Sequence, residues 1–574
     1  MPVKHMLKDG KSTAAVCRND AFDAECDVLV VGLGTAGASA AIAAARQGCS
    51  VIGADAAPLP GGVCTAACVW DYYYGARGGL YREINCEADD ILKRGIYLSA
   101  EREGVHSYPT SVKSLALEKA LDSLGVVCHY STVLTAVYAD GDRVCGVELL
   151  GDRPLRIRAK VVIDGANGAV CRILGLPNMG GRRSDGKTAR FSRTIAMRDA
   201  DGQLCGAWRQ GDALPQNVTT EAMSDSYYKW STQAPCYPER FSKTNRLYGI
   251  GYVTGVREVP CVQTEETYTF LDYLNGRRPQ KVAFYALSQL DNSCADVWNE
   301  DDDYVDWRVL CDLNPYAFSV GVSPKMMIAK GMENLLLAGK HIGTGHIMSS
   351  GVRMRTDMEK CGEAAGVLAA LSVANHCSAG EIAESHFDEY RRILAESGCY
   401  NADNDRGVCD MNLTDGEMWR SCPLPKDTGE LKRSLMSTTP GLGLLALRMG
   451  RIPIDGTVAA WLRSDHRLLR ENTAVALGML GDTASLPVLR EILKGDTETV
   501  THYWDEWNYF WYSTSELCNF VKAACLLARF RDPADEERMR QIAFYEGKNP
   551  IREMASHYAK RYFGIYEQLE AEVL

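Results

Sequence analysis

The chain has 574 residues, a hydrophobic fraction of 46%, a charged fraction of 24% and a formal net charge of −11 at pH 7. This length predicts two or three domains. The excess of negative charge argues against a nucleic-acid or anionic-membrane surface, because either partner repels an acidic protein. No apolar run reaches the ~18–20 residues of a membrane span, and residues 1–24 are interpreted as a polar tail without the apolar core of a signal peptide. We therefore expect a cytoplasmic protein with no nucleic-acid and no membrane partner.

The 21 cysteines are scattered along the chain, and no CxxC pair occurs. Zinc ribbons, iron–sulfur ligation and thioredoxin-type redox pairs therefore lose support, and no metal site is predicted. We expect reduced thiols that serve as small core residues.

A βαβ pattern opens the fold. The apolar run at 26–31 predicts a buried strand, the glycine-rich GLGTAG follows at 32–37, and the alanine-rich segment 38–47 predicts a helix. A second strand is predicted over 50–55. This order of elements around GxGxxG is typical of a dinucleotide-binding site.

Each element of this pattern has a physical task. Gly32 makes the tight turn, Gly34 lets the backbone approach a pyrophosphate, and Gly37 lets helix and strand pack closely. The start of the helix presents unpaired N–H groups to the phosphates. Asp55 ends the second strand, where a carboxylate accepts hydrogen bonds from an adenosine ribose. The pattern predicts a cofactor that contains ADP.

Further elements follow the βαβ unit. A GGVCT turn stands at 61–65, directly after the ribose acid, where its backbone would lie against a flavin. Segments 132–138, 143–150 and 155–163 predict a β-meander. The last of these strands ends on Asp164, which glycines follow in DGANG.

These motifs resemble the FAD-dependent oxidoreductase family, within the fumarate reductase and glutathione reductase-like two-dinucleotide-binding flavoproteins. The resemblance covers residues 25–190 and 300–375. Where relatives end the meander with Asp-Ala-Thr-Gly-Asp, this chain has DGANG and lacks the threonine hydroxyl. The resemblance implies bound FAD. It places the following residues at the cofactor: Gly32, Gly34, Thr35, Ala36, Gly37, Asp55, Gly61, Gly62, Thr65, Val133, Asp164, Gly339, His341 and Gly366.

A later segment, MENLLLAGK at 332–340, predicts a buried strand. It resembles the family's strand that returns to the dinucleotide-binding sheet. The resemblance implies that a helix beginning at Gly362 covers the flavin, and that Gly362 and Gly366 let this helix approach closely. Its positive end would stabilise negative charge at the N1–C2=O edge of a reduced flavin.

Several cationic and ionisable side chains around this strand are candidates for catalysis or binding. The resemblance implies that His346 transfers a proton, with Tyr73 as a second candidate, and that Arg353 lies beside the flavin or a substrate anion. Lys340 is expected at the strand end, facing solvent or phosphate. Arg355 is expected to be a surface residue in ion pairs with nearby acids.

The resemblance to the family implies that residues 191–305 form a substrate-side insertion. Arg257 and Glu258 there resemble the family's GxRExRR segment, but Val-Pro-Cys replaces the later arginines and weakens the case for a dicarboxylate clamp. Aromatic residues gather at 70–74 and 503–512. They suit a sugar or another ring, although aromatic side chains also fill cores and interfaces.

Near the C-terminus, helical patterns at 469–493 recur at 520–543 and resemble HEAT repeats. Two repeats are fewer than a free solenoid needs, so we expect them to dock on the flavoprotein body or on a second subunit, which makes a homo-oligomer a possible outcome.

The predicted fold class is α/β: a Rossmann-like FAD-binding domain with a β-meander, an inserted α+β substrate domain and a C-terminal α-helical HEAT-like domain. The predicted segments are a tail (1–24), a first FAD-binding segment (25–190), the insertion (191–305), a second FAD-binding segment (306–375), a helical connector (376–460) and the HEAT-like domain (461–574).

The predicted function is that of an FAD-dependent oxidoreductase that transfers a hydride between a small organic substrate and flavin N5. A sugar, polyol or related ring compound is slightly favoured. Three alternatives stay open: a C=C reductase of the fumarate-reductase type, a redox-neutral FAD-dependent hydratase or isomerase, and a scaffold with a vestigial cofactor fold. The substrate and the electron acceptor are not named by the sequence.

Overall fold

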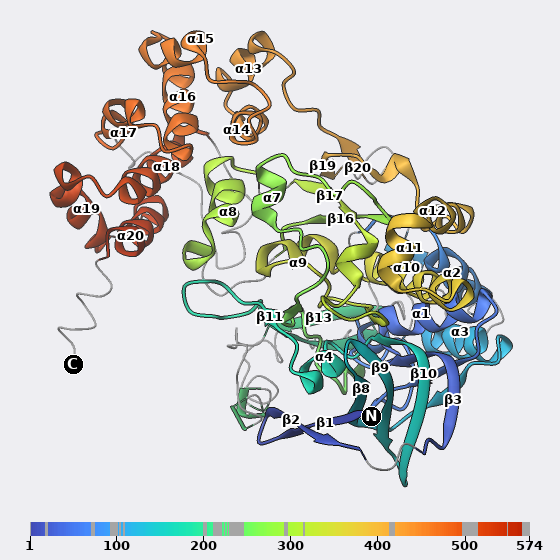
Figure 1. Ribbon diagram of the computed structural model, residues 1–574. Coiled ribbons are helices and arrows are strands. Elements are labelled where there is room, and N and C mark those ends of the chain that lie inside the picture. The colour runs from blue at the N-terminus through green and yellow to red at the C-terminus, as the bar shows by residue number, and fades with distance from the viewer. Residues whose placement is uncertain are drawn as a thin grey trace. The chain divides into compact units, whose positions relative to one another are not determined.

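One large sheet carries the dinucleotide motif (Figure 1). The computed structural model describes residues 2–17, 21–69, 75–91, 101–102, 105–106, 110–198, 204–210, 221–222, 224–226, 228, 246–291, 297–313, 316–411, 419–495, 515–547 and 549–564. Over these residues the sheet has nine strands. In sheet order they are β2 (Lys11–Val16), β1 (Val3–Lys8), β8 (Val133–Asp140), β9 (Arg143–Leu150), β10 (Pro154–Asp164), β3 (Ala24–Val31), β4 (Val51–Ala54) and β7 (Val127–His129), while β18 (Leu335–Leu337) pairs with β10.

The parallel region of the sheet confirms the predicted βαβ unit. Strand β3 pairs in parallel with β4 and β10, and β10 pairs in parallel with β18. Val28, Leu29 and Val30 of β3 are fully buried, as a strand covered on both faces requires. Helix α1 (Thr35–Arg46) connects β3 to β4 and begins three residues before the predicted start at 38.

The β-meander is also confirmed, because β8, β9 and β10 pair in antiparallel fashion. The prediction of a tail over residues 1–24 is wrong. Strands β1 and β2 form a hairpin, and β1 extends the meander by pairing with β8. The hairpin lies at the edge of the sheet and β2 is exposed, so its sequence is polar and resembles a tail.

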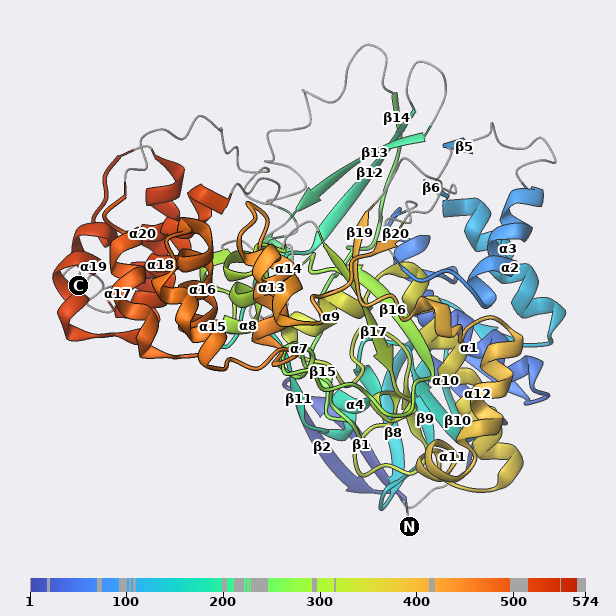
Figure 2. The ribbon, with the colours of Figure 1, turned by 90° about the horizontal axis from the view of Figure 1, so that it is seen from above.

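Helix α10 (Arg355–Asn375) lies beside α1 (Figures 1 and 2). The predicted helix start at Gly362 is wrong, because the helix begins at Arg355. Gly362 is an interior position, where a Cβ atom would lie 1.9 Å from the carbonyl oxygen of Ala36. At Gly366 a Cβ would lie 2.3 Å from the carbonyl oxygen of Ala40. The small residues of α10 therefore let two helix backbones touch.

The chain divides into two units, which we describe separately. Unit 1 comprises residues 1–269, 279–295 and 318–406, and unit 2 comprises residues 270–278, 296–317 and 407–574. This division does not follow the predicted borders at 375 and 460. The tasks assigned to the predicted segments therefore stay predictions.

Unit 1 contains further elements around the sheet, and Figure 2 shows three of its strands, β12 to β14, side by side. These elements are α2 (Leu80–Ile91), β5 (Glu101–Arg102), β6 (Val105–His106), α3 (Thr110–Ser123), α4 (Ala169–Leu174), β11 (Asn178–Met179), β12 (Ser192–Arg198), β13 (Leu204–Gln210), β14 (Arg246–Ile250), β15 (Cys261–Val262), β16 (Phe284–Gln289), β17 (Ala317–Val322), α9 (His346–Val352), α11 (Ala379–Ser385) and α12 (Phe387–Glu396).

Unit 2 is mainly helical. Its elements are α7 (Phe270–Leu274), α8 (Asp302–Val305), β19 (Val408–Met411), β20 (Trp419–Ser421), α13 (Thr428–Leu435), α14 (Gly441–Arg448), α15 (Gly456–Ala460), α16 (Arg467–Met479), α17 (Leu486–Ile492), α18 (Ser515–Phe530), α19 (Glu536–Ala543) and α20 (Pro550–Phe563). Helices α16 to α19 match the predicted helical segments, while the HEAT-like assignment and a homo-oligomer stay predictions. The aromatic cluster at 503–512 lies outside the described residues. None of the described helices combines the length and apolar character that crossing a bilayer demands.

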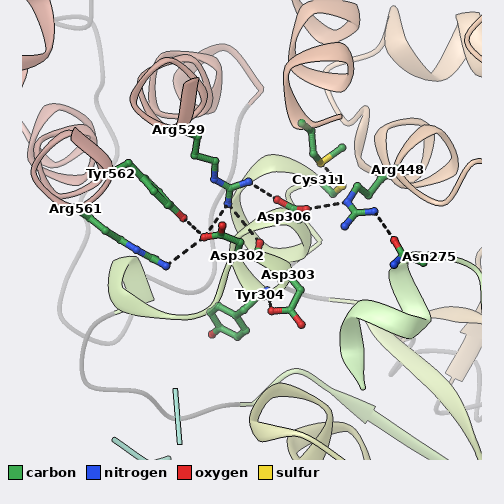
Figure 3. A network of polar contacts seen from close by, with 11 residues as sticks. Asn275, Asp302, Asp303, Tyr304, Asp306, Cys311, Arg448, Arg529, Arg561 and Tyr562 are labelled. Carbon is green, nitrogen blue, oxygen red and sulfur yellow. Dashed lines mark hydrogen bonds and ion pairs between the residues drawn. The ribbon is translucent and has the colours of Figure 1, made fainter. Parts of the chain in front are cut away.

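A polar network holds unit 2 together (Figure 3). The carboxylate of Asp306 is 6% exposed and accepts hydrogen bonds from Arg448 Nε at 2.8 Å and Arg529 Nη1 at 2.6 Å. Arg448 belongs to α14 and Arg529 to α18, so one carboxylate joins two helices. Asp302, four residues earlier, accepts from the Tyr562 hydroxyl at 2.6 Å but is 61% exposed.

We expect the replacement Asp306→Asn to lower the free energy of unfolding of unit 2 by about 3–5 kcal/mol. The largely buried Arg448 loses the carboxylate to which it donates, and Arg529 loses its shorter ion pair and retains Asp302 at 3.9 Å. Urea denaturation followed by far-UV circular dichroism measures this effect. Asp302→Asn is the matched control and should cost about 1 kcal/mol or less, because water screens an exposed carboxylate. Equal effects of the two variants would contradict the assignment.

For unit 1 we expect Gly362→Ala to destabilise the protein by about 1–3 kcal/mol, because the added methyl group collides with the backbone of α1. The control is Gly380→Ala in α11, where a Cβ would meet only Ser378 Oγ at 3.8 Å. That replacement should stabilise by up to about 1 kcal/mol through helix propensity. Thermal unfolding of both variants measures these effects. A Gly362→Ala protein with the midpoint temperature of the native protein would contradict the backbone contact between α1 and α10.

Candidate cofactor site

The glycine loop after β3 shows which of its glycines serve the fold. Gly32 has φ +93° and its Cβ would lie 2.5 Å from the carbonyl carbon of Gly165. A Cβ at Gly37 would lie 1.8 Å from the carbonyl oxygen of Gly32. At Gly34, in contrast, no atom lies within 4 Å of the Cβ position. The open space at Gly34, beside the N-terminus of α1, fits a bound pyrophosphate.

A second glycine loop closes against the first. Gly62 has φ +55° and its Cβ would lie 3.0 Å from Gly34 Cα. The Thr35 hydroxyl donates to the carbonyl oxygen of Gly61 at 2.9 Å, and the Thr65 hydroxyl donates to that of Pro60 at 2.6 Å. Gly61 and Thr65 thus stabilise the conformation of this loop through hydrogen bonds and do not line the cavity described below.

Asp55 stands at the carboxyl end of the second parallel strand, as predicted. Its Oδ1 accepts a hydrogen bond from the backbone N–H of Ala57 at 2.7 Å. Partial burial raises the pKa of Asp55 above its ordinary value. The backbone N–H of Thr132 donates to the carbonyl oxygen of Asp55 at 3.0 Å, which brings the start of β8 beside the acid.

These loops open into a cavity of about 700 Å³ within unit 1. This volume lies in the range of cofactor and ligand sites. The predicted site residues that line it are Gly32, Gly34, Thr35, Ala36, Asp55, Gly62, Val133, Gly339 and Arg353. Gly37, Gly61, Thr65, Asp164, His341, His346 and Gly366 are not among its lining residues. Tyr73 and the aromatic segment 70–74 lie outside the described residues.

Asp164 is fully buried and acts on the cavity indirectly. Its Oδ1 accepts from the backbone N–H of Ala166 at 3.0 Å, and its Oδ2 accepts from that of Val170 at 2.9 Å. The carboxylate therefore fixes the turn at 165–167, whose residues line the cavity, and the start of α4. No threonine hydroxyl is needed for this arrangement.

His341 and Gly366 are likewise set back from the cavity. His341 is fully buried, its Nε2 lies 3.0 Å from the carbonyl oxygen of Asp164, and burial lowers its pKa below the ordinary value. Gly366 lies in the interior of α10 against α1, so its small size serves helix packing.

His346 is 6% exposed, and its Nδ1 lies 2.8 Å from Glu258 Oε1. Glu258 also accepts from the backbone N–H groups of Gly181 at 2.8 Å and Ala189 at 2.7 Å. The His346–Glu258 pair therefore joins the start of α9 to the insertion.

Two further cationic residues reach the cavity, Arg355 against its predicted surface position and Lys340 at the predicted strand end. Arg355 is not a surface residue: it is 8% exposed, lines the cavity and donates to the carbonyl oxygen of Val69. Lys340 also lines the cavity and donates to the carbonyl oxygen of Val256. The signal for Lys340 was its place just after a parallel strand, the end at which α/β sheets bind ligands.

The insertion contributes one wall of the cavity. Tyr252, Val253, Thr254 and Val256 line it. The backbone N–H of Tyr252 donates to the carbonyl oxygen of Ala66 at 3.1 Å, directly after the GGVCT turn. The substrate-side insertion predicted from the sequence therefore contacts the second glycine loop.

Residues in the first turns of α10 form hydrogen bonds with residues that precede and follow the segment 70–74 in the chain. Asp357 accepts from the backbone N–H groups of Ala76 at 2.9 Å and Leu287 at 3.1 Å, and burial raises its pKa to about 7. Glu363 accepts from the N–H of Leu80 at 2.7 Å. Together with the contact from Arg355 to Val69, these bonds anchor both sides of the segment 70–74.

Comparison with known proteins agrees with this site. A family model described as FAD dependent oxidoreductase matches residues 27–241 and 216–394, which is more than half of the chain. A probable electron transfer flavoprotein-quinone oxidoreductase, YgcN of Escherichia coli K12, is 30% identical over 168 residues, 26% of this chain. The chain spans only 38% of the length of that relative.

Solved structures show weaker likenesses. A geranylgeranyl bacteriochlorophyll reductase-like protein of Thermoplasma acidophilum is 12% identical, with a TM-score of 0.34 over 82% of this chain and 99% of that one. The anhydrotetracycline hydroxylase OxyS of Streptomyces rimosus is 12% identical, with a TM-score of 0.32 over 67% and 68%. At these TM-scores we draw nothing from them. The family model, together with the glycine loops and Asp55, shows that FAD is the cofactor and that the chain belongs to the FAD-dependent oxidoreductase family.

Proposed function

We propose that the protein transfers a hydride between a small organic substrate and FAD. The observation that carries this proposal is the cavity that joins the dinucleotide motif to Lys340, Arg353 and Arg355. When bound, FAD supplies a flavin N5 that takes up or releases a hydride. Oxidation of a substrate C–H beside a hydroxyl group breaks that C–H bond and passes the hydrogen with both bonding electrons, as a hydride, to FAD. The hydroxyl proton passes to the protein, and the carbon and oxygen are left as a C=O group.

The cofactor residues have separate tasks in this proposal. The backbone N–H groups of Thr35 and Ala36, at the start of α1, bind the pyrophosphate. Asp55 accepts from the ribose hydroxyls. Val133 begins β8, next to Thr132, which donates to Asp55, and would contact the cofactor from the cavity wall.

For the hydroxyl proton we propose His346 as the acceptor. The Glu258 carboxylate at its Nδ1 stabilises a protonated imidazole and orients the ring. Because His346 does not line the cavity, this task requires the wall beside it to open when substrate binds. Tyr73 remains a second proposed acceptor.

The substrate class is open to direct test. A sugar or polyol remains the proposed class from the sequence, yet its aromatic support lies outside the described residues. The cations at the cavity make an enoate, and therefore C=C reduction, a second candidate. Both directions of hydride transfer use the same cofactor site.

We expect Gly34→Ala to weaken FAD binding about tenfold or more, because its methyl group projects into the space left for the pyrophosphate. The folded protein has room for this methyl group and the Gly34 φ of −65° suits alanine, so thermal stability of the FAD-free protein should not change. Fluorescence titration with FAD measures the affinity. Unchanged affinity would exclude this cavity as the cofactor site.

Anaerobic mixing of the FAD-loaded protein with sugars, polyols, amines and enoates tests the function. Oxidation of a substrate should bleach the visible absorbance of the flavin, whereas an enoate should reoxidise a flavin reduced beforehand. His346→Gln should slow the responsive reaction by about 10²–10⁴-fold with unchanged FAD content, because it removes a proton acceptor. Product formation without any change in flavin absorbance would instead indicate a redox-neutral reaction.

A further inference from the structure

Three cations that the protein largely encloses meet at the wall formed by the insertion, β18 and α9. Lys340 and Arg353 line the cavity, and the Arg353 side chain is 10% exposed. Arg257 follows Val256, another lining residue, and its charge acts on both Lys340 and Arg353. We call Arg257, Lys340 and Arg353 the cation cluster.

The hydrogen-bond partners of the cation cluster are mostly neutral. Lys340 donates to the carbonyl oxygen of Val256, and Arg257 Nη1 donates to that of Arg190 at 2.8 Å. Arg353 Nη2 lies 3.1 Å from Asp291 Oδ2, which makes one ion pair. Within the described residues no carboxylate lies within ion-pair distance of Lys340 or Arg257, and the buried Nε of Arg353 has no hydrogen-bond partner.

Nearby groups leave the positive charge in excess. Glu258 is adjacent in sequence, but its two oxygens already accept from two backbone N–H groups and contact His346. Burial, followed by the positive charge of Arg353 and Arg257, lowers the pKa of Lys340 to about 7. Burial, together with the charges of Arg353 and Arg190, lowers the pKa of Arg257 to about 10, although the negative charge of Asp291 acts in the opposite direction. Enclosing like charges is unfavourable unless a negative group joins them.

The proposed pyrophosphate position already has its own donors. The proposed pyrophosphate position is the open space at Gly34, on the loop between β3 and α1, where helix N–H groups serve it. The cation cluster comes from other segments. Guanidinium groups bind carboxylate or phosphate through parallel hydrogen bonds, and an ammonium adds a point charge.

We propose that the cation cluster is the subsite for an oxyanion group of the substrate, a carboxylate or a phosphate, held at the cavity beside the flavin. This inference rests on the proposed function, because it assumes that the substrate reacts in this cavity. The anion would bind to Arg353 and Lys340 at the wall, while Arg257 adds positive charge behind them.

Binding to the FAD-loaded protein tests the subsite without any turnover. The probes are glycolate, inorganic phosphate and, as a neutral match for glycolate, ethylene glycol, followed by calorimetry and by the flavin absorbance. We expect glycolate or phosphate to bind at least about tenfold more tightly than ethylene glycol. Whichever of the two binds more tightly identifies the oxyanion.

Variants locate the binding site. Arg353→Met and Lys340→Met should each weaken the binding of the tighter oxyanion about tenfold or more, and Arg353→Lys should restore some of the loss. FAD content should stay unchanged. Arg392→Met removes the same charge at an exposed position of α12 that does not line the cavity, and it is the control for net charge.

The pH dependence provides an independent readout. Lys340 is charged below a pH of about 7, and Arg257, Arg353 and the neighbouring His341 are the titratable groups that act on it. Oxyanion affinity should therefore fall as the pH rises through about 7 in the native protein. In Lys340→Met this fall should disappear.

Two results would overturn the subsite. The first is that neither oxyanion binds more tightly than ethylene glycol to a protein that holds FAD and whose flavin is reduced by a neutral substrate. The second is that Arg353→Met or Lys340→Met loses FAD, which would assign the cluster to the cofactor. Failure of the proposed function looks different, because it would appear as absent FAD or an unresponsive flavin in the native protein.

Discussion

The backbone contact between α1 and α10 is the constraint on which unit 1 depends. A Cβ at Gly362 or Gly366 would collide with the carbonyl oxygen of Ala36 or Ala40, so these positions have to be glycine. Helix α1 carries the start of the dinucleotide site at Thr35 and Ala36. The contact therefore fixes a segment some 300 residues later in the chain against the cofactor loop. With α10 in place, β18 pairs with the end of β10, and Lys340 follows close to the loop that Asp164 holds.

The same helix buries charge at its first turns, and that charge has a structural role. Asp357 bonds to the backbone of two separate segments, while Lys360 donates to the carbonyl oxygen of Tyr285 at 2.7 Å. Burial raises the pKa of Asp357 to about 7 and lowers that of Lys360. A carboxyl group with a raised pKa in the fold contributes stability that is complete below its ordinary pKa and is lost as the pH rises through about 7. The anchoring of Ala76 thus depends on the charge balance of Asp357 and Lys360, whereas Leu80 is held separately by Glu363.

The βαβ unit, the meander and the returning strand could be predicted because each depends on local patterns: apolar runs, turn glycines and a terminal acid. The helix start could not, since glycine allows close approach to a flavin and to another helix equally well. Which of the two a glycine contacts depends on the group packed against it in the fold, and at Gly362 that group is the backbone of α1. The sequence favours a surface position for Arg355 because charged residues are rarely buried. Residues 3–16 resemble a tail in sequence because an edge strand such as β2 can be polar on both faces.

The cation cluster could not be predicted from any single segment of the sequence. The segment after Glu258 has Val-Pro-Cys in place of further arginines, which argued against an anion clamp. The fold supplies the missing cations from elsewhere: Lys340 from the end of β18 and Arg353 from the end of α9. Because the three cations come from three segments, the cluster exists only when the insertion packs against the returning strand. An oxyanion bound there offsets charge that the protein otherwise has to enclose. Binding and folding of this wall should therefore reinforce each other, since a ligand that binds only the folded state stabilises that state.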